Sequence, residues 1–184
     1  MPEGWRFDRT LLDTEAMRAT IRRMAEEIVE CTEGADDVLL IGVRTRGLPL
    51  AEAINDAIEE RTGERLALGV LDITLYRDDL STIAPQPVVK ETRLPGSIDD
   101  RTLVLCDDVL FTGRTVRAAL EALVDFGRPS RVYLAVLVDR GLRELPIQAD
   151  IVGEAIETTR DEQIEVQFPS TDEAEKVDLL VREK

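Results

Sequence analysis

The chain has 184 residues, a length typical of one domain and sufficient for a sizeable hydrophobic core. Its 23 basic and 38 acidic residues give a formal net charge of −15, which argues against unspecific attraction to nucleic acid or to an anionic membrane. The absence of histidine excludes His-based triads, histidine general bases and His-ligated zinc. Cys31 and Cys106 fit neither a metal-binding spacing nor a disulfide framework, and no apolar run reaches membrane-spanning length. We therefore expect a cytoplasmic protein.

Helices and buried strands are predicted to alternate along the first half of the chain. Apolar residues at helical spacing predict a helix over 13–30, and the continuous apolar run 38–43 predicts a strand that is covered on both faces. A helix over about 49–61 follows, and then a long strand over 66–77. The polar, proline-containing continuation 78–87 predicts a mobile loop or hairpin.

The second half repeats this alternation. Buried strands are predicted from Leu103 and over 132–138, with a helix over 116–126 between them, and short apolar stretches follow at Ile151 and Ile164. Alternating strands and helices predict an α/β fold with a mostly parallel central sheet flanked by helices. We expect a single domain over residues 1–184, with tails at about 1–12 and 169–184.

The most informative segment is LVLCDDVLFTGRT, residues 103–115. Two adjacent carboxylates, Asp107 and Asp108, stand near the end of a predicted buried strand, and a small-residue turn then leads into a helix. Ligands of open α/β sheets bind at the carboxyl ends of the strands, and a helix N-terminus attracts phosphate. One segment could therefore hold the hydroxyls of a sugar or a hydrated metal ion together with a phosphate.

Two further turns follow buried strands, GVRTRG at 42–47 and DRG at 139–141. In a parallel sheet the carboxyl ends of the strands face the same way, so all three turns are expected to converge on one crevice. Arginine and threonine between glycines suit an anion such as a diphosphate, because exposed backbone N–H groups can form an anion nest there.

The apolar strand, the two acids and the Thr-Gly-x-Thr loop resemble the phosphoribosyl diphosphate (PRPP) signature of type I phosphoribosyltransferases. Four segments together, VRTRG, LDITLYRDDLS, LCDDVLFTGRTVRAALEALVDFGRP and LAVLVDRGLRELPI, resemble the PyrR family of bifunctional pyrimidine operon attenuation regulators and uracil phosphoribosyltransferases. This resemblance implies a type I phosphoribosyltransferase fold with a flexible flap and a small hood. It also implies a cytoplasmic enzyme of UMP salvage that converts uracil and PRPP to UMP and diphosphate.

The resemblance also implies a role for each loop. It assigns the ribose hydroxyls to Asp107 and Asp108. The 5′-phosphate is assigned to the loop Thr112, Gly113, Arg114 and Thr115, and the diphosphate to Arg44, Thr45 and Arg46. Tyr76 and Arg77 are expected to act in catalysis where the flap begins. The edge of uracil is expected to be read near Val138, Asp139 and Arg140, and Mg²⁺ is the expected cofactor, with Asp139 as a candidate ligand.

Relatives, as the resemblance implies, form dimers or larger homo-oligomers and bind pyrimidine leader mRNA when UMP is present. Here Arg22, Arg23 and Arg143 are the candidate RNA contacts. Glu26, Gln148 and Glu154, however, stand where the family is expected to carry a histidine or basic residues. A carboxylate in place of a cation adds repulsion toward phosphate, so we expect weak or absent RNA binding.

Three alternatives remain at this point. The chain could sense UMP or UTP as an RNA-binding attenuator with little or no catalysis. It could be another phosphoribosyltransferase, acting on purines, because the PRPP motif concerns only the sugar half of the reaction. A receiver-type signalling domain also places carboxylates at strand ends, but it needs no Thr-Gly-Arg-Thr anion loop.

Overall fold

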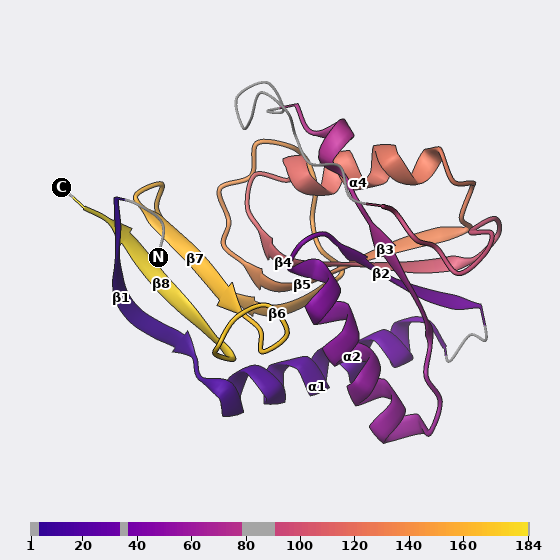
Figure 1. Ribbon diagram of the computed structural model, residues 1–184, viewed down its shortest axis with the longest axis horizontal. Helices are drawn as coiled ribbons and strands as arrows, with labels where there is room; N and C mark the ends of the chain where they lie inside the picture. The colour runs from indigo at the N-terminus through magenta and orange to yellow at the C-terminus, as the bar shows by residue number, and fades with distance from the viewer. Residues whose placement is uncertain (1–3, 34–36, 79–90, 184) are drawn as a thin grey trace.

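The central element of the molecule is a five-stranded sheet with strand order β3-β2-β4-β5-β6, in which every pairing is parallel. The computed structural model (Figure 1) describes residues 4–33, 37–78 and 91–183. The strands are β2 (Val38–Val43), β3 (Ala67–Leu71), β4 (Thr102–Leu110), β5 (Arg131–Asp139) and β6 (Ile151–Ala155). The predicted α/β class with a mostly parallel sheet is confirmed.

Helices cover both faces of this sheet. Figure 1 shows α1 (Thr14–Cys31) and α2 (Gly47–Thr62) on one face, and α4 (Arg114–Val124) with the short 3₁₀ helix η1 (Thr74–Tyr76) on the other. Each face has its own core. Fully buried side chains such as Met17 and Met24 pack under α1, and Val116 and Leu123 pack under α4. The burial of one apolar stripe on each helix explains the helical spacing in the sequence.

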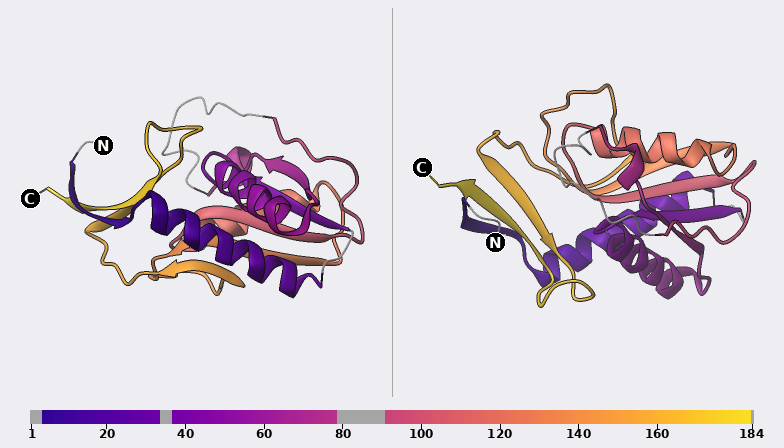
Figure 2. Two further views of the ribbon diagram at one scale, coloured as in Figure 1. Left: turned by 90° about the horizontal axis from the view of Figure 1, so that it is seen from below. Right: turned by 45° about the horizontal axis from the view of Figure 1, so that its top comes forward.

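A second sheet lies at one end of the molecule and contains both ends of the described chain. It pairs β1 (Trp5–Leu12), β8 (Lys176–Arg182) and β7 (Glu162–Gln167) in antiparallel fashion, in the order β1-β8-β7 (Figures 1 and 2). The expectation of tails at 1–12 and 169–184 is therefore wrong for these strands. We call this sheet the hood, because it lies beside the carboxyl end of the central sheet.

The predicted strand over 66–77 is also too long. It ends at Leu71, because the Asp72 carboxylate accepts hydrogen bonds from the backbone N–H and the hydroxyl of Thr74, at 2.9 and 2.5 Å, and so forms a turn. Most of the predicted mobile loop, residues 79–87, lies outside the described residues.

Candidate active site

The register of the central sheet brings the three predicted turns to one edge. Cys106 of β4 lies opposite Gly42 of β2 and opposite Ala135 of β5, so the three strands run side by side to their carboxyl ends. The loops after β2 and β5 and the last residues of β4 therefore meet at the same edge, where open α/β sheets bind their ligands.

Asp107 and Asp108 form the acidic centre of this edge. They lie within β4 itself, since the strand continues to Leu110, and Asp107 is only 6% exposed. Burial, together with the adjacent charge of Asp108, raises the pKa of Asp107 well above its ordinary value, while the charge of Arg77 acts in the opposite direction. Burial also raises the pKa of Asp108. A buried and a half-buried carboxylate side by side favour a ligand that supplies hydrogen-bond donors or positive charge.

The loop after β2 comes close to the backbone of β4 at Cys106 and Asp107 because of Gly47. A Cβ atom at Gly47 would lie 2.3 Å from the carbonyl oxygen of Cys106, so only glycine lets the start of α2 come this close to β4. In the same loop, Nε of Arg44 is the only buried side-chain nitrogen or oxygen without a hydrogen-bond partner among the described residues. A buried N–H group without an acceptor fits an anionic ligand.

Arg46 joins this loop to the hood. Its two terminal nitrogens contact the carboxylate of Asp172 at 2.5 and 3.1 Å, and one of them also donates to the carbonyl of Val166. Hydrogen bonding to Arg46 lowers the pKa of Asp172 to about 2. Sequence reasoning missed Asp172, because no local pattern connects two residues that are 126 positions apart.

The turn after β4 has the geometry of a phosphate loop. Gly113 caps α4 with a φ of 91°, in the left-handed region, and the helix begins at Arg114 with its backbone N–H donating to the hydroxyl of Thr112 at 3.4 Å. The guanidinium of Arg114 contacts the carboxylates of Asp78 at 2.6 Å and Glu144 at 3.0 Å. The beginning of the predicted flap therefore lies against the predicted phosphate loop.

Tyr76 does not lie at this site. Its hydroxyl donates to Asp125, just beyond the C-terminal end of α4, whereas the phosphate loop lies at the N-terminal end. An 11-residue helix spans about 16 Å, so the Tyr76 hydroxyl lies near the end of α4 that is opposite to the phosphate loop, and the catalytic role of Tyr76 stays a prediction. The side chain instead packs η1 onto α4.

The turn after β5 also differs from expectation. The carboxylate of Asp139 accepts from the backbone N–H of Gly141 at 2.9 Å and from Arg143, so both of its oxygens are engaged and its surroundings argue against a metal ligand. Although burial acts to raise the pKa of Asp139, these hydrogen bonds lower it overall. The buried guanidinium of Arg140 stacks on Phe111 at 4.1 Å and donates to the loop at 158–162. The side chain of Val138 is fully buried.

The three candidate RNA contacts are not equivalent. Arg22 is exposed on α1. Arg23 forms an ion pair with Glu27 at 2.7 Å and donates to the carbonyls of Val152 and Gly153. Arg143 faces inward, and its side chain is 22% exposed. They therefore do not form a shared basic surface.

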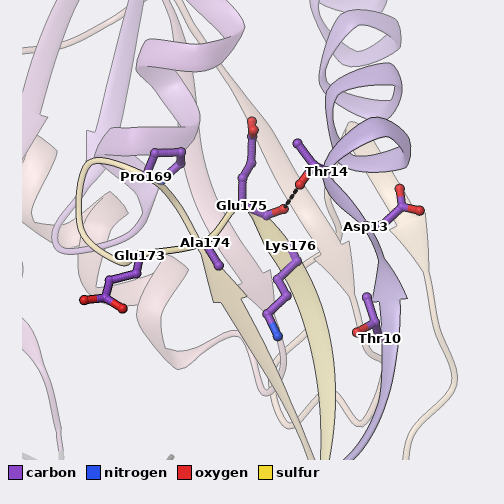
Figure 3. A pocket seen from close by; sticks show the side chains of 8 residues that line it. All are labelled: Thr10, Asp13, Thr14, Pro169, Glu173, Ala174, Glu175 and Lys176. Carbon is purple, nitrogen blue, oxygen red and sulfur yellow. Dashed lines mark hydrogen bonds between the residues drawn. The ribbon is translucent and has the colours of Figure 1, made fainter.

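A separate cavity of about 450 Å³ lies below the hood, between the N-terminus of α1 and the connection from β7 to β8 (Figure 3). In it the hydroxyl of Thr14 donates to the carbonyl of Glu175 at 2.9 Å. None of the predicted site residues lines it. Within the described ranges, no three or more His, Cys, Asp or Glu side chains are grouped so that they could hold a metal ion. No described helix is both long and apolar enough to cross a membrane.

Comparisons with known proteins agree with this architecture. The model of the phosphoribosyl transferase domain family matches residues 9–173. The bifunctional protein PyrR of Thermus thermophilus is 51% identical over 178 residues, which cover 97% of this chain and 98% of that protein. The bifunctional protein PyrR of Roseiflexus sp. is 54% identical over 165 residues, 90% of each chain.

Solved structures show the same fold at lower identity. A hypoxanthine-guanine phosphoribosyltransferase from Bacillus anthracis superposes with a TM-score of 0.72 at 17% identity, covering 96% of this chain and 99% of that one. The fold is therefore that of the type I phosphoribosyltransferases. The family match over most of the chain and the identity of about one half to curated relatives place this chain in the PyrR family of phosphoribosyltransferases.

Proposed function

We propose that this protein converts uracil and PRPP to UMP and diphosphate. The observation that carries this proposal is the placement of Asp107 and Asp108 next to a phosphate-type loop at the carboxyl edge of the central sheet, in a chain of this family. The protein would act in the cytoplasm as a dimer or tetramer, as the family resemblance implies.

The substrate would lie across the edge of the sheet. Asp107 and Asp108 would accept hydrogen bonds from the ribose hydroxyls, and Thr112, Gly113, Arg114 and Thr115 would bind the 5′-phosphate. The diphosphate would contact Arg44, Thr45 and Arg46, where the unpartnered Nε of Arg44 supports an anion site. The backbone at 138–140 would hydrogen-bond the edge of uracil.

Mg²⁺ fits this edge as an ion that arrives with the diphosphate. Magnesium is commonly held by one or two carboxylates together with substrate phosphates, and Asp107 and Asp108 provide such a pair. Loss of hydration raises the pKa of both carboxyl groups, and the charge of Asp108 raises the pKa of Asp107 further; a dication would relieve both effects. When bound, the ion would neutralise charge on the leaving diphosphate.

Departure of diphosphate builds positive charge on the ribose ring. The side chains of this site would contribute by positioning the two reactants and by placing carboxylates near that charge. The positive charge of Arg77 acts to lower the pKa of Asp107. Arg77 would therefore add a cation near the diphosphate.

The test is the formation of UMP by the purified protein with uracil, PRPP and Mg²⁺. Asp107→Asn should retain the fold and lose roughly a hundredfold or more in rate, since a few kcal/mol of electrostatic stabilisation is removed. Hypoxanthine in place of uracil is the control for a purine-specific enzyme. No UMP at saturating substrate concentrations would contradict the proposal.

A second, regulatory function is favoured by the family, whose curated members are named bifunctional. The ligand would be pyrimidine leader mRNA, bound in a UMP-dependent manner. We propose that this binding is weak in this chain, for reasons of charge that are argued in the Discussion.

A further inference from the structure

The phosphate loop is attached to the loop that follows β5 by backbone hydrogen bonds. The N–H of Arg140 donates to the carbonyl of Leu110 at 3.0 Å, and the N–H groups of Glu144 and Leu145 donate to the carbonyl of Thr112 at 3.0 and 3.1 Å. The phosphate loop therefore does not hold its conformation alone. It is shaped by residues 140–147.

Arg143 is the side chain at the centre of this contact. Its Nη1 donates to the carbonyl of Phe111 at 2.8 Å and lies 3.4 Å from the carbonyl of Leu110. The same nitrogen contacts the carbonyl of Gly141 at 3.2 Å, and Nε donates to the carbonyl of Ile147 at 2.9 Å. The guanidinium thus contacts four backbone carbonyls in two loops. Its Nη2 also forms an ion pair with the carboxylate of Asp139.

These contacts determine which way the phosphate loop presents its N–H groups. In a trans peptide unit the C=O and N–H bonds point in opposite directions. Arg143 holds the carbonyl of Phe111, so the N–H of Thr112 points away from Arg143. The carbonyl of Thr112 is held by the N–H groups of Glu144 and Leu145, so the N–H of Gly113 points away from that segment as well. Successive outward N–H groups form the kind of nest that binds phosphate.

We propose that Arg143 is a positioning residue of the phosphate loop. This inference rests on the proposed function in one respect, namely that residues 112–115 bind the 5′-phosphate of PRPP. A lysine would not replace Arg143, because a single ammonium group cannot reach acceptors spread over the planar fork of a guanidinium.

The experiment compares Arg143→Met and Arg143→Lys with the wild type in Mg²⁺-dependent PRPP binding by calorimetry and in UMP formation. Arg65→Met is the matched control, since Arg65 forms ion pairs with Asp56 and Glu59 near the C-terminal end of α2, away from the carboxyl edge. We expect the Kd and KM for PRPP to rise about tenfold or more in both Arg143 variants, with the KM for uracil within twofold of wild type. Arg65→Met should behave as wild type.

Two further measurements separate positioning from general loss of structure. Hydrogen exchange at residues 112–115 should become faster in both Arg143 variants while the strands of the central sheet stay protected. Ethylguanidine added to Arg143→Ala should restore part of the PRPP affinity, whereas ethylamine should not. If Arg143→Met fails to fold, Arg143→Lys and the chemical rescue still decide the question.

The inference is overturned if either Arg143 variant keeps wild-type affinity for PRPP, or if the KM values for PRPP and uracil rise together. Loss of RNA binding with unchanged PRPP affinity would also overturn it. Binding of PRPP does not depend on the identity of the base. A wild-type protein that binds PRPP but makes no UMP therefore contradicts the proposed function alone, whereas one that does not bind PRPP contradicts both.

Discussion

The carboxylate of Asp107 lies in a buried position, which disfavours its charged form. Its pKa is raised by burial and by the neighbouring Asp108, so the folded state holds its proton more tightly than the unfolded chain does. Stability is therefore lost as pH rises from the unfolded pKa of about 4 through the raised pKa of the folded state. The ionised carboxylate of Asp107 therefore lowers the stability of the fold, and a bound ligand that supplies donors or positive charge would offset this loss.

We predict that Asp107→Asn is more stable than wild type at pH 7. Removing a buried negative charge of this kind typically raises the free energy of unfolding by about 1 kcal/mol. For a chain of this length this gain corresponds to about 2–4 °C in Tm. Thermal unfolding at pH 7 and pH 3 measures this effect. The difference should shrink at pH 3, where the wild-type carboxyl group is protonated in both states. An equal or lower Tm at pH 7 would contradict the argument.

Asp172 should show the opposite pH dependence. Its folded pKa is about 2, below the unfolded value of about 4, so its contribution is fully present above pH 4 and is lost as pH falls toward 2. Asp172→Asn should lower the free energy of unfolding by about 1 kcal/mol at pH 7, the upper end of the range for ion pairs that are partly exposed to solvent. Denaturant unfolding at pH 7 and pH 2.5 checks this. A difference that is the same at both pH values would show that the ion pair with Arg46 is not its source.

At the scale of elements, the approach of α2 to β4 depends on Gly47. In Gly47→Ala the new methyl group would overlap the carbonyl of Cys106, so α2 must shift and carry Arg44 and Arg46 with it. We expect a loss of about 1–3 kcal/mol in stability and a higher KM for PRPP. Gly63→Ala is the control: Gly63 has a φ of 78°, which favours glycine, but no atom lies near its Cβ position, whereas Gly47 is constrained by the close approach alone. It should lose stability without a change in KM, and similar KM values in both variants would refute the role of Gly47.

Helices and strands that bury a regular apolar pattern could be predicted from the sequence. Elements without such a pattern could not be predicted. The run Val38–Val43 is buried at every residue, and its strand was predicted with the correct bounds. By contrast, β1 is largely exposed and carries charged residues between its apolar ones, so it resembled a tail. Its partner β8 is defined by a pairing between the two ends of the described chain, which no local pattern reveals.

The same distinction applies to the site. The acids and the phosphate loop are adjacent in sequence and could be recognised together. The place of the Tyr76 hydroxyl could not be predicted, because the direction of this side chain depends on the packing of η1 against α4, whereas the charge of the neighbouring Arg77 acts to lower the pKa of Asp107. The inward direction of Arg143 likewise depends on carbonyl groups in two loops that meet only in the folded protein.

For the whole molecule, the net charge of −15 opposes any polyanion. The exposed cations add little to counter it. Arg23 is paired with Glu27, and Glu26 is paired with Arg61, while Arg143 is turned inward. Arg22 alone of the three candidates remains on the surface without a described ion pair. Few phosphate contacts can therefore form, and counterion release would supply little free energy.

We predict that a pyrimidine-leader stem-loop binds no more tightly than about micromolar at physiological salt, the range of unspecific association. Titration in the presence of UMP measures this affinity. As a control, the triple variant Glu26→Lys, Gln148→Arg and Glu154→Lys should bind at least about tenfold more tightly. Nanomolar binding by the wild type that is enhanced by UMP would refute the prediction.

The strand order of the hood has a consequence for the order in which the protein becomes functional during synthesis. β8, the last strand of the described residues, is the middle strand of the hood, so β1 and β7 lack their partner strand until Lys176–Arg182 has left the ribosome. The central sheet needs only residues up to Ala155 and can form earlier. Arg46 would therefore acquire Asp172 as its partner after the central sheet has formed, and a nascent chain would have its phosphate loop before its hood.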